Sequence, residues 1–448
     1  MVSVWPNIPG TGSQIPVANY AAGITELYPN VNRVRLVETA INSRERIDFM
    51  PSNVGINQQI NDKYIEFRVN GSVGSFLDLS TLTLELKLSF VKKGAKLDDQ
   101  TNIAIANGIS NTLIKSVNVF LNDKLVETTP FYNYVSYIKM VKTIKNEYLK
   151  SKGVCAFLQD DSVGGITNLY SARIFTDDTS EKRVMANLKL KGVETCFPLL
   201  LDICSLDMFL LDNINLRIRL EMATDQWVIC SNDNNNGIDM TVDKAKLWID
   251  RVIPNVNAML ALNDSLREKR LQCLFDKTLI KCHIIPQGNS NLVIEQPFNN
   301  VIPEKMTLCF IDNRNFSGDY RRNPLYFDNC NITNITISIN GNIIHNLTSN
   351  FVGEYAMRSY YESIRTVDVE KGGLLDHESF INGRTIFTFN FTHEDSSEAI
   401  PIELNANMRI SITLGTPLGD PHVLLLIGET MGILSVDESR NIQCDFRG

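Results

Sequence analysis

Apolar and polar residues alternate along much of this chain. The clearest case is residues 81–90. Its apolar positions are Leu82, Leu84, Leu86, Leu88 and Phe90, and its polar positions are Thr83, Glu85, Lys87 and Ser89. Because successive side chains of a strand point to opposite faces, we expect the apolar set to face a core and the polar set to face solvent.

Segments with the same pattern recur between turn-forming clusters. They are residues 115–126, 215–222, 244–252, 331–344, 385–392 and 407–414. Many strands with one apolar face, joined by long polar connections, favour antiparallel sandwiches over parallel βαβ units. The pattern therefore predicts an all-β protein.

Two segments have helical periodicity instead. In residues 131–150 the expected inward residues are Phe131, Tyr134, Val135, Ile138, Val141 and Tyr148, and the opposite face has Lys139, Lys142, Lys145 and Asn146. We interpret this lysine face as solvated, with contact to nucleic acid as the alternative. In residues 352–365 the expected inward residues are Tyr355, Ala356, Tyr360 and Ile364.

The two halves of the chain match each other. Residues 117–126 and 335–344, which lie 218 residues apart, both read as a strand, a polar turn and a returning strand. The turns are Asn122-Asp123 and Asn340-Gly341, and such pairs suit a two-residue hairpin because they tolerate positive φ. Residues 215–220 also resemble 407–412, and each half ends in one more strand. Three matches in the same order predict a duplicated domain of about 200 residues.

We divide the chain into an extended N-terminal arm at residues 1–45, a first copy at 46–258 and a second copy at 259–448. The arm contains four prolines and little periodicity, which is typical of a terminus that is disordered or that orders on a neighbouring subunit. The joint between the copies is expected near residues 253–270, which have helical character.

Composition narrows the class of protein. The 448 residues are 44% hydrophobic and 21% charged, which is typical of a globular chain and excludes a disordered or fibrous one. The net charge of −8 disfavours a dedicated nucleic-acid binder, because affinity for phosphates comes from concentrated lysine and arginine. We expect no export signal and no membrane-spanning segment, and we expect the nine scattered cysteines to be reduced thiols in a protein made in the cytosol.

No residue pattern predicts catalysis, a cofactor or a metal. The five histidines include no pair at i, i+4, and the sequence has no Walker, dinucleotide or nucleophile-elbow motif. We interpret His393-Glu394-Asp395 and the carboxylate pairs at 98–99, 160–161 and 177–178 as solvated loops. We therefore expect no catalytic, cofactor-binding or metal-binding residues, and a protein that is not an enzyme.

Three stretches of the sequence resemble one protein family. They are the block of Asp312, Phe316-Ser317-Gly318-Asp319-Tyr320 and Asn323-Pro324-Leu325-Tyr326-Phe327, residues 206–209, and residues 436–442. Together with the duplicated sandwich, they resemble the double jelly-roll major capsid proteins of Polinton (Maverick) elements and of related adenovirus-type, hexon-like DNA viruses. The block at 312–327 is the most specific of the three.

The resemblance implies two tandem eight-stranded antiparallel jelly-roll sandwiches with a short helix in each. It also implies a structural function, in which a homotrimer forms a pseudo-hexagonal capsomer that tiles an icosahedral shell around double-stranded DNA. The implied partners are further copies of the chain, penton and other minor capsid proteins, and packaged DNA through weak non-specific contacts. The implied location is the virion capsid, assembled in the cytoplasm or nucleus, with contacts between subunits expected at the helices and at residues 160–183.

A carbohydrate-binding or carbohydrate-active jelly-roll protein is the alternative. It predicts exposed aromatic residues clustered in a groove, with a carboxylate pair or a Ca²⁺ site. The chain has three tryptophans, Trp5, Trp227 and Trp248, and the last of these lies in an alternating strand. A capsid protein domesticated by a host would show the same sequence features as a viral one.

Overall fold

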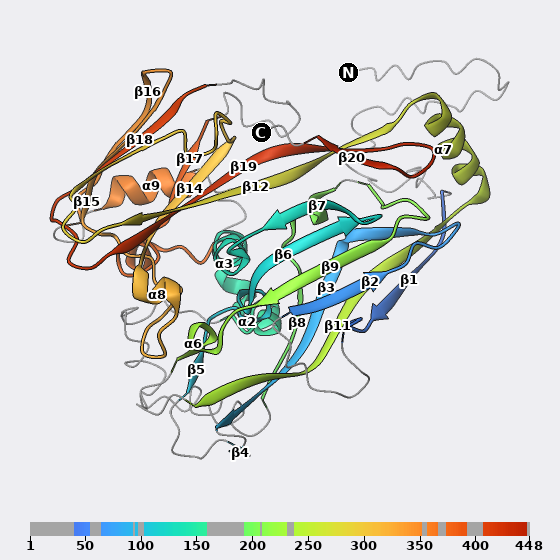
Figure 1. Ribbon diagram of the computed structural model, residues 1–448, viewed down its shortest axis with the longest axis horizontal. Coiled ribbons are helices and arrows are strands. Elements are labelled where there is room, and N and C mark those ends of the chain that lie inside the picture. The colour runs from blue at the N-terminus through green and yellow to red at the C-terminus, as the bar shows by residue number, and fades with distance from the viewer. Residues whose placement is uncertain are drawn as a thin grey trace, which may run out of the picture.

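The computed structural model describes residues 40–53, 64–92, 95–96, 103–158, 192–206, 208–230, 237–351, 356–365, 373–391 and 406–445. Within these ranges the chain forms two β-sandwiches in sequence order, and the pairings between named strands are antiparallel. Figure 1 shows the first sandwich, coloured blue to green, beside the second, coloured yellow to red.

The first sandwich has two main sheets. One has the order β1 (Ile41–Phe49), β11 (Ile238–Pro254), β3 (Phe76–Lys92) and β8 (Val193–Pro198), with β4 (Ala95–Lys96) also paired to β3. The other has the order β2 (Tyr64–Val69), β9 (Leu216–Met222), β6 (Ile114–Leu121) and β7 (Lys124–Thr129). A separate ribbon pairs β5 (Ala104–Ile105) with β10 (Ile229–Cys230).

The second sandwich repeats this arrangement. One sheet has the order β12 (Leu271–Ile285), β19 (His422–Val436), β14 (Lys305–Asp312) and β17 (Phe387–Asn390), with β20 (Ile442–Asp445) on the far part of β19. The other has the order β13 (Asn291–Glu295), β18 (Met408–Leu414), β15 (Ile332–Ile339) and β16 (Asn342–Thr348). We number the eight main strands of each copy in chain order and leave out the short β4, β5, β10 and β20. In both copies one sheet then has the order 1-8-3-6 and the other the order 2-7-4-5. The prediction of two tandem eight-stranded jelly-roll sandwiches is therefore confirmed.

The hairpins show the duplication in atomic detail. Asn122 and Asn340 both have positive φ, and each accepts a backbone hydrogen bond on its side chain, from Asn215 N at 2.8 Å and Asn407 N at 2.9 Å respectively. A β-bulge follows residue 119 in the first hairpin and residue 337 in the second, which is the same 218-residue offset. Equal bulges at equal positions bend the two hairpins in the same way.

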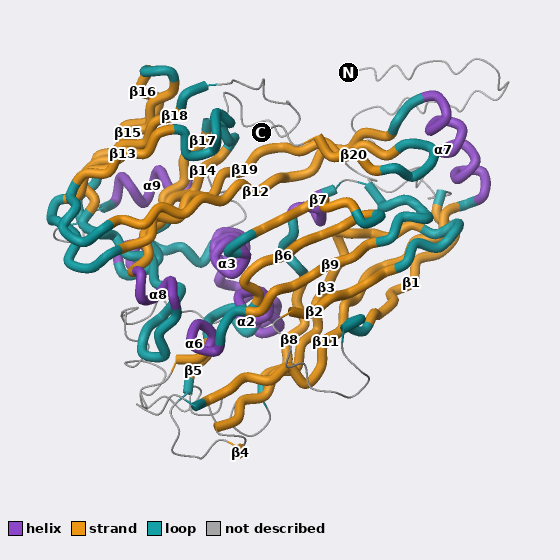
Figure 2. Tube along the Cα trace, in the orientation of Figure 1, coloured by secondary structure: helices purple, strands orange, loops and turns teal. Residues whose placement is uncertain are grey.

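Short helices connect the strands. They are α2 (Ile109–Thr112), α3 (Tyr132–Thr143), η1 (Asn146–Tyr148), η2 (Leu149–Gly153), α4 (Val154–Ala156), η4 (Asp202–Ser205), α6 (Asp225–Val228), α7 (Val256–Glu268), α8 (Asn313–Ser317), α9 (Met357–Arg365) and α10 (His377–Ile381). Figure 2 shows that α3 lies between the sandwiches with α2 beside it, whereas α7 and α9 lie at opposite ends of the molecule. Among the described residues, no helix combines the length and the apolar composition that crossing a membrane requires.

Both predicted helices exist, but their extents differ from the prediction. The first, α3, ends at Thr143 because Ile144 is extended, and the chain continues to residue 156 in short irregular turns that leave Tyr148 exposed rather than inward. In the second, α9, Tyr360 and Ile364 pack against the core as predicted, while Tyr355 lies outside the described residues.

The alternation in residues 81–90 predicts the core correctly. All five apolar residues of this segment, which forms part of β3, are at most 4% exposed. Thr83 is an exception on the other face, because Arg46 reaches over the sheet and donates a 2.9 Å hydrogen bond to its hydroxyl, which leaves Thr83 buried.

Two elements of the structure extend across the boundaries of the predicted domain division. Residues 41–49 pair along β11, so β1 begins within the predicted arm, and residues 1–39 lie outside the described residues. The predicted division at residue 258 falls inside α7, which connects β11 to β12.

We predict that core positions of β3 dominate the stability of the first sandwich. Leu86→Ala should lower the free energy of unfolding by about 3 kcal/mol, since truncating a fully buried leucine leaves a cavity. Leu125→Ala, at a leucine that is 44% exposed, is the matched control and should cost under about 1 kcal/mol. Urea denaturation of both variants measures the difference, and equal losses would contradict the assignment of the core.

Candidate functional site: the interface between the two sandwiches

Helix α3 lies between the sandwiches and is buried on nearly every side. Nine of its 12 residues are buried, including the polar side chains of Asn133 and Ser136. A helix that is buried all round must find partners for its polar groups inside the protein. The contacts of α3 therefore decide how the two sandwiches fit together.

An aromatic cluster joins α3 to the second sandwich. The ring of Tyr134 stacks on Phe316 and meets Trp227 edge-on, with ring centroids 5.6 Å apart in both pairs. Phe327 lies 6.4 Å from Tyr134 and 6.1 Å from Tyr137. Offset and edge-to-face pairs contribute about 0.5–1.5 kcal/mol each beyond the burial of their area. The cluster thus holds α3 of the first sandwich against the loops of the second.

Arg384 extends this contact from the side of the second sandwich. Its guanidinium is fully buried, and it donates hydrogen bonds to the Tyr137 hydroxyl at 3.3 Å and to the Leu374 carbonyl at 3.0 Å. The backbone N–H of Leu374 in turn donates to the Val141 carbonyl in α3 at 2.8 Å. The segment around Leu374 therefore ties the C-terminal part of α3 to the buried arginine.

Asp202, in η4, is the centre of a buried polar network between the sandwiches. Its carboxylate accepts hydrogen bonds from Lys139 Nζ at 3.0 Å, from Thr278 N at 2.6 Å and from the Thr278 hydroxyl at 2.7 Å. Thr278 belongs to β12, so one carboxylate connects α3, η4 and the second sandwich. Asp202 is only 3% exposed, and such a charge is tolerated because it is both paired and hydrogen-bonded.

A second carboxyl group, that of Glu127 in β7, lies next to this network. It accepts hydrogen bonds from Asp202 N at 3.0 Å, Ile203 N at 2.9 Å and the Thr129 hydroxyl at 3.0 Å. Burial and the neighbouring charge of Asp202 raise the pKa of Glu127 to about 7, although the two backbone donors oppose this shift. The carboxyl group therefore changes protonation near neutral pH inside the interface.

The lysine face of α3 is half-buried, and its ammonium groups bond to other parts of the chain. Lys142 Nζ donates a 2.7 Å hydrogen bond to the Thr307 hydroxyl in β14, and burial lowers its pKa. Burial alone would also lower the pKa of Lys139, but the charge of Asp202 more than offsets this and raises it. For these two lysines the interpretation as a freely solvated face is wrong, because Lys139 bonds to Asp202 in η4 and Lys142 bonds to Thr307 in the second sandwich.

The block that carries the family resemblance, residues 312–327, begins at the end of β14. Asp312 caps α8 by accepting a 2.8 Å hydrogen bond from Arg314 N, and it also pairs with Arg322 Nη1 at 2.9 Å. Asn323 closes the following turn by accepting from Leu325 N at 2.9 Å. These polar residues shape the loop through their hydrogen bonds.

The apolar members of the same block make the contact with the first sandwich. Phe316 and Phe327 are its two aromatic contributions to the cluster around Tyr134. Gly318 has a φ of 94°, and a Cβ at this position would lie 3.1 Å from Trp227 N in α6. The glycine is therefore required both by the backbone conformation and by the close approach of α6.

The closing segment, residues 436–442, holds another part of the interface. Arg440, in the turn between β19 and β20, pairs with Asp212 of the first sandwich through Nη2 at 2.6 Å and Nε at 3.1 Å. Its carbonyl accepts from Asn122 Nδ2 at 3.1 Å, and the Ile442 carbonyl accepts from Lys124 Nζ at 3.0 Å. The C-terminal hairpin thus contacts the first-sandwich hairpin at Asn122 and Lys124.

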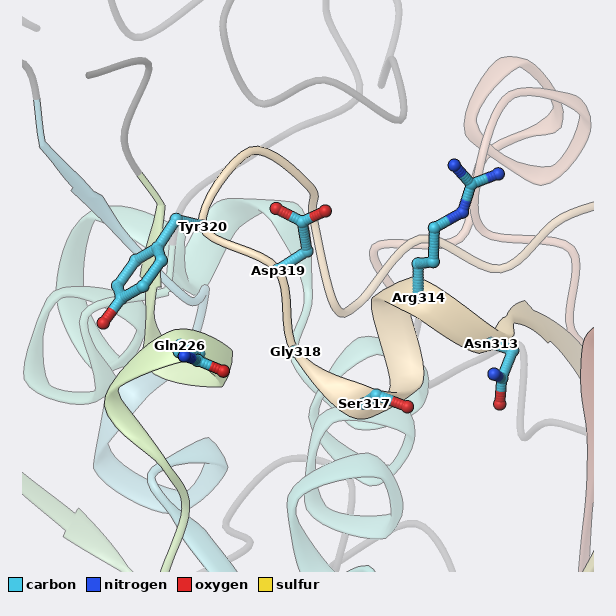
Figure 3. A pocket seen from close by; sticks show the side chains of 7 residues that line it. All are labelled: Gln226, Asn313, Arg314, Ser317, Gly318, Asp319 and Tyr320. Atoms are coloured by element: carbon cyan, nitrogen blue, oxygen red, sulfur yellow. The ribbon is translucent and has the colours of Figure 1, made fainter. Parts of the chain in front are cut away.

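An open pocket of about 270 Å³ lies where α6 approaches α8. Figure 3 shows its lining, which consists of Gln226, Asn313, Arg314, Ser317, Gly318, Asp319 and Tyr320. The Arg314 guanidinium is already paired with Asp420 at 2.5 Å. The pocket lining contains one serine, Ser317, and no histidine or cysteine. These lining residues therefore do not form a serine nucleophile with a histidine base.

The polar clusters considered in the sequence are not placed by the structure. His393-Glu394-Asp395, the carboxylate pairs at 98–99, 160–161 and 177–178, and the loop 160–183 lie outside the described residues. The structure instead brings together Asp328, Cys330 and His422, with their ligand atoms all within 4.8 Å of one another. Motif spacing could not predict this cluster, because 92 residues separate Cys330 from His422.

Comparison with known proteins bears on the fold. No family model and no curated protein matches this sequence. A chain in the structure of the Sputnik virophage matches with a TM-score of 0.59 at 13% identity, over 97% of this chain and 94% of that chain. The mavirus major capsid protein matches with a TM-score of 0.52 at 11% identity over 99% and 97%, and the Faustovirus major capsid protein with 0.58 at 8% over 90% and 92%. The chain therefore has the double jelly-roll fold of these proteins over nearly its full length.

We predict that Asp202 holds the two sandwiches together. Asp202→Asn should lower the free energy of unfolding by about 2 kcal/mol, because it leaves the half-buried Lys139 ammonium group without its carboxylate partner. Asp264→Asn, on the exposed surface of α7, is the matched control and should change stability by under about 0.5 kcal/mol. Thermal and urea unfolding measure both variants, and an Asp202→Asn protein as stable as the control would disprove the role of the network.

We also predict that Glu127 makes stability depend on pH. Because its pKa rises from 4.5 to about 7 on folding, the folded chain binds more protons between these values, and this contribution to the free energy of unfolding falls as pH rises through that window. The change is at most about 3 kcal/mol. Glu127→Gln should flatten the dependence between pH 5 and 7, whereas the exposed Glu268→Gln should leave it as in the wild type. Denaturation midpoints across this range provide the measurement.

Proposed function

We propose that this chain is a structural major capsid protein of a double-stranded DNA virus, and that it is not an enzyme. The observation that carries the proposal is the fold match, which spans nearly all of this chain and nearly all of the mavirus and Faustovirus major capsid proteins. The buried interface supports it physically, since two sandwiches locked by α3 form one rigid block. The proposed domain division is an arm at 1–45 and two jelly rolls at 46–258 and 259–448, with the joint in α7.

We propose further that three copies form a ring, and the two copies of the helix after the hairpin supply the argument. In the first sandwich this helix is α3, which is covered by the second sandwich. In the second sandwich it is α9, which exposes Met357 (57%) and Tyr361 (58%) on one face at i, i+4 spacing. The second sandwich covers α3, but the chain has no further sandwich that could cover α9. In an oligomer, the first sandwich of another copy would cover it.

The outer faces of the two equivalent sheets, the one with β14 and the one with β8, also differ in burial. In the second sandwich β14 is buried at seven of its eight positions, because its outer face packs on the α3 side of the first sandwich. The equivalent sheet of the first sandwich has a partly solvated outer face, as the alternation of buried and exposed residues in β8 shows. This face has charged side chains such as Lys87 and Lys244. By analogy with the contact inside the chain, α9 of a neighbouring copy would cover it.

Head-to-tail contacts of this kind close into a ring when the rotation per copy is a simple fraction of a turn. In Figure 1 α9 and the β1 edge of the first sandwich lie on opposite sides of the molecule, which is the arrangement such a contact needs. If the junction between chains repeats the junction within a chain, each sandwich turns by about one sixth of a revolution, and three chains complete a pseudo-hexagonal capsomer.

The proposed partners are other capsomers, penton and minor capsid proteins, and the packaged DNA. With a net charge of −8, and with Lys139 and Lys142 used inside the interface, we expect only weak, non-specific contact with DNA. The proposed location is the virion capsid, with synthesis in the host cytosol and assembly in the cytoplasm or nucleus.

The carbohydrate-binding alternative finds less support. Trp227 is 4% exposed inside the interface, and Trp248 donates a 2.7 Å hydrogen bond to Glu85 in β3. Among the described residues, the exposed large aromatic side chains are Tyr148 and Tyr361, which lie in different helices. A sugar-binding groove needs such residues side by side.

The trimer makes a direct prediction. The wild-type chain should have three times the monomer mass of 50.5 kDa in size-exclusion chromatography with light scattering, and negative-stain images should show hexagonal outlines. Met357→Asp combined with Tyr361→Asp should give folded monomers, because two carboxylates would be desolvated in the contact.

Leu260→Asp is the matched control, since it places a carboxylate on the exposed face of α7 at the other end of the molecule. This variant should remain trimeric. A wild-type protein that stays a uniform monomer at high concentration would refute the capsomer proposal, whereas a wild-type trimer that tolerates both α9 substitutions would refute only the placement of the contact.

A further inference from the structure

Asp328, Cys330 and His422 meet where three strands of the second sandwich begin or end. Asp328 bridges to Phe310 near the end of β14, Cys330 lies two residues before β15, and His422 is the first residue of β19. One carboxylate oxygen, one thiol sulfur and one imidazole nitrogen lie within 4.8 Å of one another. This cluster belongs neither to the interface between the sandwiches nor to the pocket at α8.

The orientation of His422 is determined by its surroundings. Its Nδ1 lies 2.8 Å from the carbonyl oxygen of Asp420, which can only accept, so Nδ1 must bear a hydrogen. In the neutral ring Nε2 then has a free lone pair, and it faces Asp328 Oδ2 at 3.3 Å. Two acceptors at this distance repel each other unless a positive charge lies on or between them. His422 is more than nine-tenths buried and the Asp328 side chain is 31% exposed, so water can reach this contact only from the Asp328 side.

The backbone between Asp328 and Cys330 brings the thiol to the same place. Asp328 Oδ1 accepts a 3.1 Å hydrogen bond from Cys330 N, and Cys330 has a φ of 46°, a conformation that few non-glycine residues adopt. This turn leaves Asp328 Oδ2 free to face His422. Cys330 is a free thiol.

The cations nearby are already paired with other carboxylates. Arg322 pairs with Asp312, and Arg314 pairs with both Asp312 and Asp420. In the part of the chain that the structure describes, His422 is the ion-pair partner of Asp328. Within the described ranges, the cluster therefore combines a carboxylate, a thiol and an imidazole without an ion pair to arginine or lysine.

We propose that Asp328, Cys330 and His422 form a zinc site, with a water molecule as the fourth ligand. The mixture of oxygen, sulfur and nitrogen ligands suits Zn²⁺ better than Mg²⁺ or Ca²⁺, which prefer oxygen alone. A histidine that binds zinc through one ring nitrogen usually donates a hydrogen bond from the other. In His422 the Nδ1–H donates to the Asp420 carbonyl, which leaves Nε2 to bind the metal.

Zinc binding requires small movements and the loss of one proton. Ligand atoms of a tetrahedral zinc site lie about 3.5 Å apart. Asp328 Oδ2 and His422 Nε2 are already 3.3 Å apart, so the main movement is an approach of the Cys330 sulfur by up to about 1 Å. The Cys330 S–H bond breaks, its proton passes to solvent, and the thiolate bonds to Zn²⁺. The metal would tie the loop after β14 to the start of β19, which fixes one end of the second sandwich.

Titration of the full chain with Zn²⁺ tests the proposal. The protein is first freed of metal with a chelator, and binding is followed by calorimetry and by competition with a chromophoric chelator. We expect one Zn²⁺ per chain, and an affinity at least about 100-fold lower in Cys330→Ser and in His422→Gln, since losing a direct ligand should cost no less than losing an outer one. Cys155→Ser, at an exposed cysteine, is the matched control and should bind like the wild type.

Co²⁺ provides a second measurement that does not depend on affinity. Bound to the wild type and to Cys155→Ser, it should show the near-ultraviolet charge-transfer absorption of a thiolate ligand, which Cys330→Ser should lose. Circular dichroism establishes that each variant is folded. If the folded wild type takes up no Zn²⁺, or if Cys330→Ser binds it equally well, the proposal is wrong, and the cluster is an imidazolium–carboxylate pair beside a neutral thiol.

Discussion

The burial of α3 between two sandwiches is the constraint on which the rest of the structure depends. A buried ammonium group costs several kcal/mol unless it is compensated. Lys139 finds its compensation at Asp202, and Lys142 finds its hydrogen bond at Thr307 in the second sandwich. Asp202 in turn reaches Thr278 of β12. These bonds can all form only in one relative position of the two sandwiches, so the polar groups select that position, while the aromatic cluster around Tyr134 supplies much of the apolar contact. The chain therefore forms one block rather than two domains on a linker.

The two sandwiches are alike in topology and different in what their equivalent parts contact. Strand order, the hairpin turns at Asn122 and Asn340 and the bulge before each turn are the same in both. The helix that follows the hairpin is internal in the first copy and peripheral in the second. Likewise, β17 is buried at three of its four positions, whereas its equivalent in the first copy, β8, alternates between buried and exposed residues. Such pairwise differences are expected when a duplicated domain satisfies a contact once inside the chain and leaves its counterpart to another molecule.

Local patterns in the sequence were sufficient for the strands, the hairpins and the duplication, because these depend on residues close in sequence. Leu82 to Phe90 and the turn at Asn340-Gly341 are examples. The same reasoning was wrong for Lys139 and Lys142, since their partners Asp202 and Thr307 lie 63 and 165 residues away. Thr83 was misassigned for the same reason, through Arg46. The block from Asp312 to Phe327 could be noticed only by resemblance. Its physical meaning, a loop shaped to place Phe316, Gly318 and Phe327 against α3 and α6, needed the three-dimensional contacts.

A duplicated fold also explains why the interface is polar at its centre. Replacing a buried ion pair by apolar residues of similar size is often neutral or stabilising, so stability alone does not account for Asp202 and Lys139. Apolar contact is non-directional and tolerates sliding, and two sandwiches with the same strand order offer several similar faces on which to pack. A carboxylate that must meet Lys139 and Thr278 together admits one angle between the sandwiches. Under the capsomer proposal, an angular error in each copy would accumulate around the ring. The main contribution of Asp202 and Lys139 is therefore to specify the angle between the sandwiches, rather than to add stability.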